Sequence, residues 1–293
     1  MPSQPKDGYA ESNGLTFHYR DWGGSGQAVV MLHGLASTSH IWDLVAPILS
    51  ADFRVVAIDQ RGHGETDKPD SGYEFASVVE DLHQLLATVG IERPIIAGHS
   101  WGGDVAIEYA VAHLDALAGL CLVDGGNMDF SRNSDWDRET ARREMAPPIF
   151  SGVTVDRFMQ RVRERWLTLT DDDRDREEIV LANFNVLDDG TIKARLSREN
   201  HLRIIDSVWD HHPRELYPRI ECPVLFMPAT QQPVGPLSPR QIHRAESIAH
   251  ADSLARVSKV VWLEDSIHDV PVQRPELVAS VISDHFDDGF FSD

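Results

Sequence analysis

The stretch GHSWGG, residues 98–103, lies between a short apolar run, residues 94–97, and a run with helical patterning that begins at Asp104. This order predicts a strand, a sharp turn and a helix, with Ser100 at the apex of the turn. The backbone of a serine at such a turn is strained and its hydroxyl is exposed, and glycine neighbours leave room for it. Unpaired N–H groups at the start of the helix favour negative charge beside the serine. The pattern predicts a nucleophile, although a turn serine without chemistry fits the same letters.

Composition limits the classes of partner. The 293 residues are enough for one large α/β domain or for a domain with a sizeable insertion. A formal charge of -20 repels nucleic acid and anionic membranes, so neither is an expected partner. No stretch has the length and apolarity of a membrane span, and the N-terminal residues do not resemble a signal peptide. We expect a cytoplasmic protein that acts on a small molecule, and no pattern bears on its oligomeric state.

The cysteines and histidines give no sign of a metal site. Cys121 and Cys222 lie in apolar, strand-like runs, where cysteine usually packs as a small hydrophobic residue. The 14 histidines and 2 cysteines include no H-E-x-x-H or paired C-x-x-C spacing, so neither a metal nor another cofactor is expected. His211 and His212 are adjacent, and we expect both at an exposed helix end before Pro213.

Apolar strands and amphipathic helices alternate along the chain. Asn13 and Gly14 separate two alternating runs and predict an N-terminal β-hairpin. Continuous apolar runs then predict strands, and apolar residues spaced by three and four predict helices. The predicted strands cover 28–32, 53–58, 94–97, 118–123, 222–227 and 259–263, and the predicted helices cover 39–49, 73–89, 101–114 and a segment that begins at Pro275. This alternation predicts an α/β fold with a mostly parallel sheet covered by helices on both faces.

Residues 127–218 interrupt the alternation. They contain acidic runs at 171–173 and 175–178 and no strand of the buried type, so we expect a helical insertion between core segments 1–126 and 219–293. Two apolar helix faces are predicted within it. One consists of Phe158, Val162 and Trp166, and the other of Leu202, Ile205 and Trp209. Their aromatic residues either pack on the core or line a ligand pocket, and both interpretations stay open.

Four motifs, in this order, resemble the α/β-hydrolase superfamily over nearly the whole chain. They are LHG at 32–34, DQRGHG at 59–64, GHSWGG at 98–103 and IHDVP at 267–271. The resemblance implies the α/β-hydrolase fold, with the insertion as a cap, or lid. Its branch includes small esterases, lactonases, cofactor-free haloperoxidases, C–C bond hydrolases, epoxide hydrolases and haloalkane dehalogenases. The last two use an aspartate at the turn, so Ser100 favours an acyl carbonyl as the target.

The resemblance also implies partners for Ser100. His268 matches the family's histidine after the last strand and is the expected general base. The backbone amides of Leu35 and Trp101 are the expected oxyanion hole. Several other polar residues of the motifs are expected to shape loops or to interact with a helix dipole. The loop-shaping group is His33, Asp59, Arg61, His63 and His99, and the helix-dipole residue is Asp104.

The acid of the triad departs from the common family position. Most relatives carry it after the strand that here covers 222–227, but the following loop, residues 228–233, reads PATQQP and holds no carboxylate. Some members carry it after the strand that follows the nucleophile helix, and there Asp124 follows the predicted strand. Asp124 is therefore the predicted acid, which would orient His268. Asp129, Asp265 and Asp269 are weaker alternatives.

These assignments together predict a carboxylesterase-like serine hydrolase that cleaves an ester or related acyl bond of a small, uncharged substrate. Ser100 would form an acyl-enzyme, His268 would transfer the proton, and water would release the acyl group. A C–C bond hydrolase or perhydrolase with the same triad is an alternative. A catalytically weak ligand-binding protein on the same fold is another.

Overall fold

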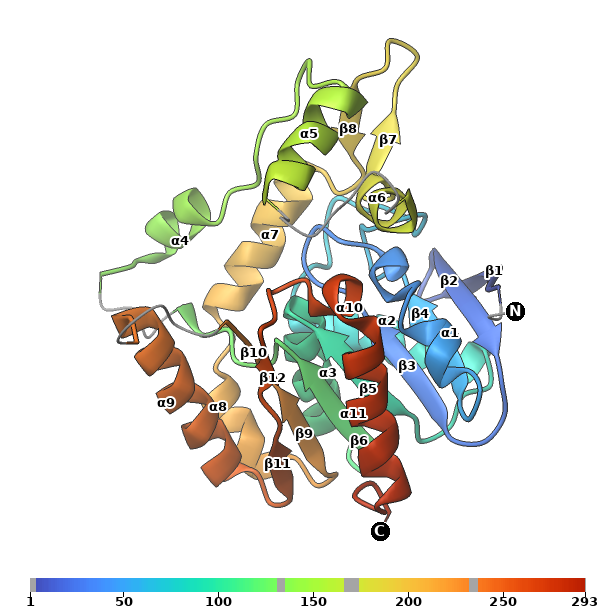
Figure 1. The fold of residues 1–293 in the computed structure, drawn as a ribbon, viewed down its shortest axis with the longest axis vertical. Helices are drawn as coiled ribbons and strands as arrows, with labels where there is room; N and C mark the ends of the chain where they lie inside the picture. The colour runs from blue at the N-terminus through green and yellow to red at the C-terminus, as the bar shows by residue number, and fades with distance from the viewer. Residues whose placement is uncertain (1–3, 131–134, 166–173, 232–236, 293) are drawn as a thin grey trace.

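An eight-stranded sheet forms the centre of the structure, a computed structural model that describes residues 4–130, 135–165, 174–231 and 237–292. The strand order is β1-β2-β4-β3-β5-β6-β9-β11 (Figure 1). The strands are β1 (Lys6–Ser12), β2 (Leu15–Gly23), β3 (Ala28–Leu32), β4 (Arg54–Ile58), β5 (Ile95–His99), β6 (Gly119–Val123), β9 (Val224–Met227) and β11 (Ser258–Val260). The pairs β1–β2 and β2–β4 are antiparallel, and the other pairs of this sheet are parallel. The mostly parallel sheet predicted from the sequence is confirmed.

The N-terminal hairpin is also confirmed. Ser12 pairs with Leu15, so the loop between β1 and β2 has two residues. Both residues of that loop have positive φ, 49° at Asn13 and 74° at Gly14. Positive φ at both central positions matches the right-handed twist of the strands, and Asn-Gly adopts it readily.

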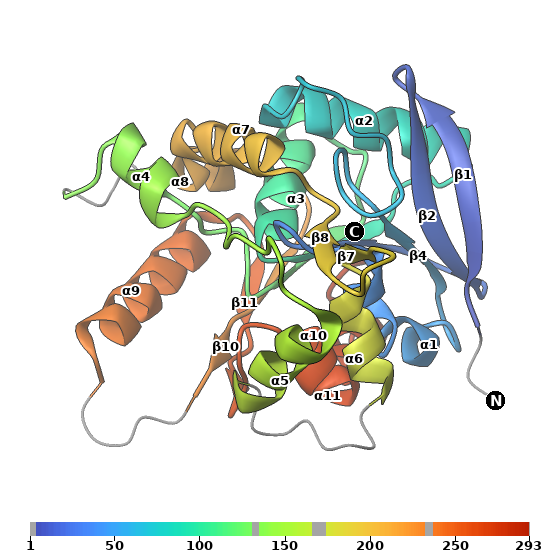
Figure 2. The ribbon, with the colours of Figure 1, turned by 90° about the horizontal axis from the view of Figure 1, so that it is seen from above.

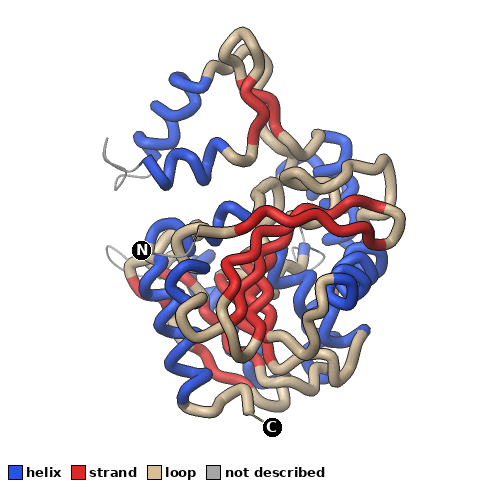
Figure 3. The backbone as a smooth tube through the Cα atoms, turned by 90° about the vertical axis from the view of Figure 1, so that its right-hand side faces the viewer, coloured by secondary structure: helices blue, strands red, loops and turns tan. Residues whose placement is uncertain are grey.

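Helices cover both faces of the sheet, because successive strand residues point to opposite sides. One face packs against α2 (Phe75–Thr88) and α3 (Trp101–Ala112). The other packs against α1 (Ala46–Leu49) and α11 (Pro275–Asp287). The strands β3, β5 and β6 are buried along their whole length, which explains their continuous apolar sequence. Figure 3 shows the strands enclosed between helices.

The single helix predicted over residues 39–49 is wrong. The chain instead forms a short 3-10 helix, Ser39–Trp42, followed by α1, Ala46–Leu49. Pro47 lies at the start of α1. Proline has no N–H to donate to the preceding turn, so a continuous helix through this position would lose a hydrogen bond and clash.

The insertion contains helices and one small sheet. Its elements up to Trp209 are α4 (Arg138–Glu144), α5 (Val155–Arg165), α6 (Arg174–Leu181), β7 (Phe184–Val186), β8 (Ile192–Ala194) and α7 (Arg198–Trp209). The antiparallel pair β7–β8 was not predicted, because three-residue strands are too short to show a period of two. Figures 1 and 2 show most of these elements together over one end of the large sheet. Trp166 and the acidic run at 171–173 lie outside the described residues.

The predicted apolar face of α7 is partly wrong. Ile205 is buried, but Leu202 and Trp209 are only half-buried. The apolar residues that α7 buries are Ile204, Ile205 and Val208, and the first and last of these join the core beneath α2 and α3. The buried face is thus rotated relative to the face predicted from spacing alone.

The C-terminal third of the chain completes the edge of the sheet. The elements are α8 (Pro213–Leu216), a 3-10 helix (Tyr217–Arg219), β10 (Ala229–Thr230), α9 (Pro239–Leu254), β12 (Leu263–Glu264) and α10 (Val270–Gln273). The strand predicted over 259–263 is divided between β11 and β12, and β12 pairs with β10. The helix α9 was not predicted, although Ser238 and Gln241 form a capping box at its start. In the part of the chain that the structure describes, no helix combines the length and apolarity needed to cross a bilayer.

Candidate active site

Ser100 occupies the sharp turn between β5 and α3. Its backbone has φ 52° and ψ -125°, a conformation that a residue with a side chain adopts only when its surroundings enforce it. The Ser100 N–H donates to the carbonyl of Val123 at 3.1 Å, and the N–H of Gly103 donates to the Ser100 carbonyl at 2.8 Å. Gly125 lies so close that a Cβ there would be 2.2 Å from the Ser100 carbonyl oxygen. These contacts hold the strained turn in place.

Three segments far apart in sequence meet at this turn. Ser100 follows β5, Asp124 follows β6, and His268 lies in the loop between β12 and α10. The Nε2 atom of His268 is 3.0 Å from Oγ of Ser100, and its Nδ1 atom is 2.6 Å from Oδ2 of Asp124. Because Asp124 can only accept when ionised, Nδ1 carries the proton and Nε2 can accept from the serine hydroxyl. The structure brings together the three residues that the sequence nominated, with Asp124 rather than Asp129, Asp265 or Asp269 at the imidazole.

The electrostatic environment keeps Asp124 ionised. Burial alone would raise the pKa of Asp124, but the hydrogen bond from His268, the charge of Arg244 and the N–H of Ala229 outweigh burial and lower the pKa. Burial likewise tends to lower the pKa of His268, but the hydrogen bond to Asp124 and the charges of Asp124 and Asp269 raise it overall. The pair is therefore arranged to stabilise an imidazolium ion next to a carboxylate.

The loop that carries Leu35 passes beside Ser100. A Cβ at Gly34 would lie 2.9 Å from Cβ and 3.5 Å from Oγ of Ser100, so only glycine fits between them. Leu35 follows Gly34 directly, and Trp101 opens α3, where an N–H has no acceptor within the helix. Both backbone amides nominated for an oxyanion hole thus belong to segments that adjoin the serine.

Two buried histidines hold the Leu35 loop. His63 accepts a hydrogen bond at Nε2 from the N–H of Ala36, at 3.2 Å, and donates from Nδ1 to the carbonyl of Arg61 at 2.9 Å. His33 accepts at Nε2 from the N–H of Gln60, at 3.0 Å, and donates from Nδ1 to the carbonyl of Gly34 at 2.8 Å. Burial lowers the pKa of both rings, so both stay neutral and keep these donor and acceptor roles. Both histidines shape the loop, as the sequence predicted.

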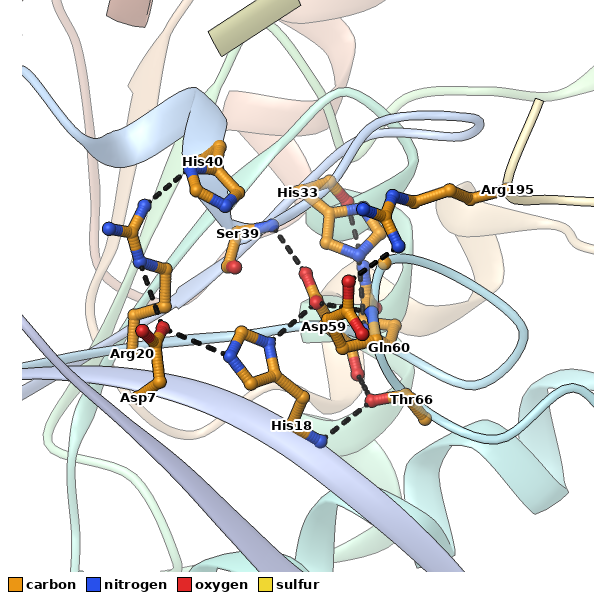
Figure 4. A network of polar contacts seen from close by, with 12 residues as sticks. Asp7, His18, Arg20, His33, Ser39, His40, Asp59, Gln60, Thr66 and Arg195 are labelled. Atoms are coloured by element: carbon orange, nitrogen blue, oxygen red, sulfur yellow. Dashed lines mark hydrogen bonds and ion pairs between the residues drawn. The ribbon is translucent and has the colours of Figure 1, made fainter. Parts of the chain in front are cut away.

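Asp59 holds the backbone that follows this loop at Ser39, and Figure 4 shows its contacts with Ser39 and His18. Its Oδ1 accepts from the N–H of Ser39 at 2.7 Å, and its Oδ2 lies 2.7 Å from Nδ1 of His18. The other ring nitrogen of His18 is 3.1 Å from Asp7 (Figure 4). Burial tends to raise the pKa of Asp59, but the contact with His18 and the surrounding donors hold it well below its usual range. Asp59 is therefore a buried, ionised anchor for the loop.

Arg61 and His99 fix two further parts of the site. Arg61 forms a two-pronged ion pair with Asp81 of α2, with contacts of 2.6 and 2.8 Å. His99 donates from Nε2 to the backbone carbonyl of His268 at 2.8 Å, and burial lowers the pKa of His99 to about 4. His99 thus stays neutral and positions the backbone that carries the candidate base.

A cavity of about 480 Å³ opens beside Leu35 and Asp269, the residue after His268. Most of its lining is apolar and comes from the insertion. Phe150, Phe158 and Phe184 line it and pack edge to face, with ring centroids 4.7 to 5.8 Å apart. Val162 also lines the cavity, so the predicted face of α5 faces a pocket rather than the core sheet.

A family sequence model described as alpha/beta hydrolase fold matches residues 27–194, which is more than half of the chain. The chain belongs to the alpha/beta hydrolase fold family. It is 31% identical over 152 residues to fluoroacetate dehalogenase of a Burkholderia species, and 35% identical over 112 residues to soluble epoxide hydrolase of a Corynebacterium species. These matches cover 50% and 38% of this chain, and the chain spans 43% and 39% of the length of the two relatives.

Solved structures share the whole fold of this alpha/beta hydrolase. The crystal structure of E-2-(acetamidomethylene)succinate hydrolase superposes with a TM-score of 0.76, covering 97% of this chain and 99% of that chain. Its sequence identity is 21%, so the likeness concerns the fold. The family is one of hydrolases, and the names of these relatives span several reactions.

The prediction for His211 is also wrong. His211 was expected at an exposed helix end, yet its side chain is buried. Its Nδ1 is 2.7 Å from Glu108, its Nε2 is 3.2 Å from Asp104, and its ring stacks on Phe75 with centroids 4.5 Å apart. The two carboxylates raise its pKa to about 9 against the effect of burial. The next residue, His212, is exposed, and the sequence around the two histidines does not indicate the distant carboxylates that contact His211.

Asp104 has a larger role in this alpha/beta hydrolase than the predicted interaction with a helix dipole. It does lie in the first turn of α3. Its fully buried carboxylate also accepts from the N–H of Met128 at 3.0 Å and contacts His211. Met128 and His211 lie near the two ends of the insertion, so Asp104 ties both ends to the helix that follows Ser100.

Sequence reasoning also missed Arg244 and His18. Arg244, on α9, forms an ion pair with Asp124. The capping box at the start of α9 could have indicated this helix in the sequence. His18 lies on β2 of the first hairpin, and only 2% of its surface is exposed. One carboxylate partner, Asp7, lies on the paired strand β1, but the other, Asp59, is 41 residues away, so no local pattern identifies His18. Within the described residues, no group of three or more histidine, cysteine or acidic side chains has an arrangement that could hold a metal ion.

Proposed function

We propose that this alpha/beta hydrolase is a carboxylesterase-like serine hydrolase. The observation that carries the proposal is the hydrogen-bonded series Ser100–His268–Asp124, with contacts of 3.0 and 2.6 Å. A serine hydroxyl is a weak nucleophile until a base within hydrogen-bond reach accepts its proton, and the base needs a third group to orient it. The series supplies the nucleophile, the base and the orienting acid in order.

In the proposed reaction Ser100 Oγ attacks an acyl carbonyl while His268 Nε2 takes the hydroxyl proton. The N–H groups of Leu35 and Trp101 stabilise the negative oxygen of the tetrahedral intermediate. His268 then donates the proton to the leaving alcohol, which leaves an ester between Ser100 and the acyl group. Water attacks that ester with His268 as base, so the enzyme returns to its starting state and no metal or organic cofactor is needed.

The cavity supports a small, uncharged and largely apolar substrate. Phenylalanine and aliphatic side chains dominate a space of about 480 Å³, and its two charged lining residues, Arg161 and Asp269, have opposite signs. Residues 127–218 act in this proposal as the cap, which sets substrate size and excludes water. We place the enzyme in the cytoplasm, where its strong negative charge keeps it away from nucleic acid and anionic membranes.

A panel of p-nitrophenyl esters with acyl chains of two to eight carbons tests this proposal. Wild-type protein is expected to hydrolyse the short and middle-length esters, and Ser100→Ala to hydrolyse none above the uncatalysed rate. A vinylogous diketone and a peroxide-forming assay on the same preparation test the C–C hydrolase and perhydrolase alternatives. Absence of ester turnover in the folded wild-type protein would contradict the proposal and favour a ligand-binding protein.

A further inference from the structure

Helix α9 brings an arginine to the candidate acid. Arg244 donates from Nη2 to Oδ1 of Asp124 and from Nη1 to the backbone carbonyl of Ala229, the latter at 2.5 Å. The N–H of Ala229 donates to the same Oδ1 at 2.8 Å. Only 6% of the Asp124 side chain and 35% of the Arg244 side chain are exposed. The acid, the arginine and one residue of β10 therefore form a closed set of contacts.

The two oxygens of Asp124 have separate partners. Oδ2 accepts from Nδ1 of His268, whereas Oδ1 accepts from Arg244 and Ala229. Rotation of a carboxylate about its last bond is broad and has no sharp minimum. Two donors on Oδ1 remove that freedom and so fix the direction in which Oδ2 faces the imidazole.

The segment after β9, which carries the acid in most relatives, instead supports an acid that lies elsewhere. It carries no carboxylate between Pro228 and Gln231. Instead, both backbone polar groups of Ala229 serve Asp124, one directly and one through Arg244. In this chain the acid follows β6, and Ala229 of β10 and Arg244 of α9 hold its carboxylate.

Arg244 also contributes charge to the site. The charged and titratable groups that act on His268 are Asp124, Asp269, Arg244 and the neutral ring of His99, whose centroid is 4.8 Å away. Both carboxylates raise the pKa of His268, and Arg244 lowers it. A positive charge beside Asp124 weakens the hold of the carboxylate on an imidazolium proton.

We propose that Arg244 is a positioning residue of the triad, which acts through Asp124 to orient its carboxylate and to limit how strongly that carboxylate holds a proton on His268. The inference rests on the proposed function, because it concerns the same three residues. It predicts a distinct pH signature, since a purely structural contact would change the rate equally at every pH.

The test is the pH profile of kcat/KM for a p-nitrophenyl ester between pH 5 and pH 9. In Arg244→Gln the acidic limb is expected to move to higher pH, by about one unit, because Arg244 has the same charge as the imidazolium and its removal favours the protonated form of His268. Activity near pH 6 then falls about tenfold more than activity at pH 8.5. Arg244→Lys keeps the charge but not the two-pronged contact. The acidic limb of its profile is therefore expected at the same pH as in the wild type, whereas kcat/KM on the plateau is expected to be lower. Arg256→Gln removes an exposed arginine that pairs with Glu221 and is expected to leave the profile unchanged.

An unchanged acidic limb in folded Arg244→Gln, or an equal loss at all pH values, would overturn the inference. A large shift in Arg244→Lys would also overturn it, and this variant serves if the glutamine variant does not fold. Titration of the His268 imidazole by NMR, in Ser100→Ala with and without Arg244→Gln, gives a readout that needs no turnover. An inactive wild-type enzyme would contradict the proposed function. An imidazole titration that is the same with and without Arg244→Gln would contradict this inference alone.

Discussion

Replacement of Asp124 by asparagine probes the proposed triad, because the hydrogen bonds of its two oxygens predict what the amide will do. Oδ1 faces two donors, from Ala229 and Arg244, so the amide oxygen of asparagine will occupy that side. The amide N–H₂ then faces Nδ1 of His268, where the carboxylate oxygen was 2.6 Å away. His268 must accept at Nδ1 and carry its proton on Nε2, so it can no longer accept the proton of Ser100.

The wrong tautomer and the lost negative charge predict a 10³- to 10⁴-fold decrease in kcat, or about 4 to 5.5 kcal/mol of transition-state stabilisation. The assay is steady-state hydrolysis of p-nitrophenyl butyrate at pH 8, with circular dichroism to show that the variant is folded. Asp269→Asn is the matched control, because it removes the carboxylate next to His268 in the chain, and its loss should be much smaller. Wild-type kcat in Asp124→Asn, or a larger loss in Asp269→Asn, would refute the assignment.

Three further predictions concern the loop, the insertion and the cavity. Gly34→Ala places a Cβ 2.9 Å from Cβ of Ser100, so the oxyanion loop must shift, and steady-state kinetics should show kcat falling about 10²-fold with a smaller change in KM; an unchanged kcat would contradict the loop assignment. His211 has a folded pKa of about 9, above its unfolded value, so its stabilising charge is complete below about pH 6.5 and disappears as the pH rises through 9. Urea unfolding should show His211→Gln losing about 2 kcal/mol relative to wild type at pH 6.5 and much less at pH 9.5, and a difference independent of pH would count against this linkage. Phe158→Ala enlarges a cavity of about 480 Å³, so the ratio of kcat/KM for octanoyl to acetyl esters should rise, and a constant ratio would show that the cavity does not hold the acyl chain.

Much of the fold was predictable because the central strands are buried on both faces. Continuous apolar runs gave β3, β4, β5, β6 and β9 to within a few residues. The two-residue turn at Asn13 and Gly14 gave the hairpin, because its backbone requirement is local. Where a local rule was overlooked, the prediction failed: Pro47 divides the predicted helix, and the capping box at Ser238 begins an unpredicted one.

The candidate site was predictable to the extent that motifs mark the ends of strands. Ser100, Asp124 and the loop before Leu35 each follow a buried strand, and parallel strands place their carboxyl ends at one edge of the sheet. His211, His18 and Arg244 were not predictable, because each has a charged partner at least 41 residues away in sequence, and burial of a charged pair leaves no local pattern. The position of the cavity also required the structure, since apolar spacing on α5 fits packing and pocket lining equally well.

Covalent trapping of Ser100 is the most direct test of whether this residue is an activated nucleophile. The protein is incubated with a small fluorophosphonate, and the adduct is located by intact-mass measurement and peptide mapping. One adduct is expected, on Ser100, with none on Ser100→Ala and a labelling rate that falls by orders of magnitude in His268→Gln. A wild-type protein that stays unlabelled, or one that is labelled at another residue, would contradict the proposal that Ser100 is an activated nucleophile.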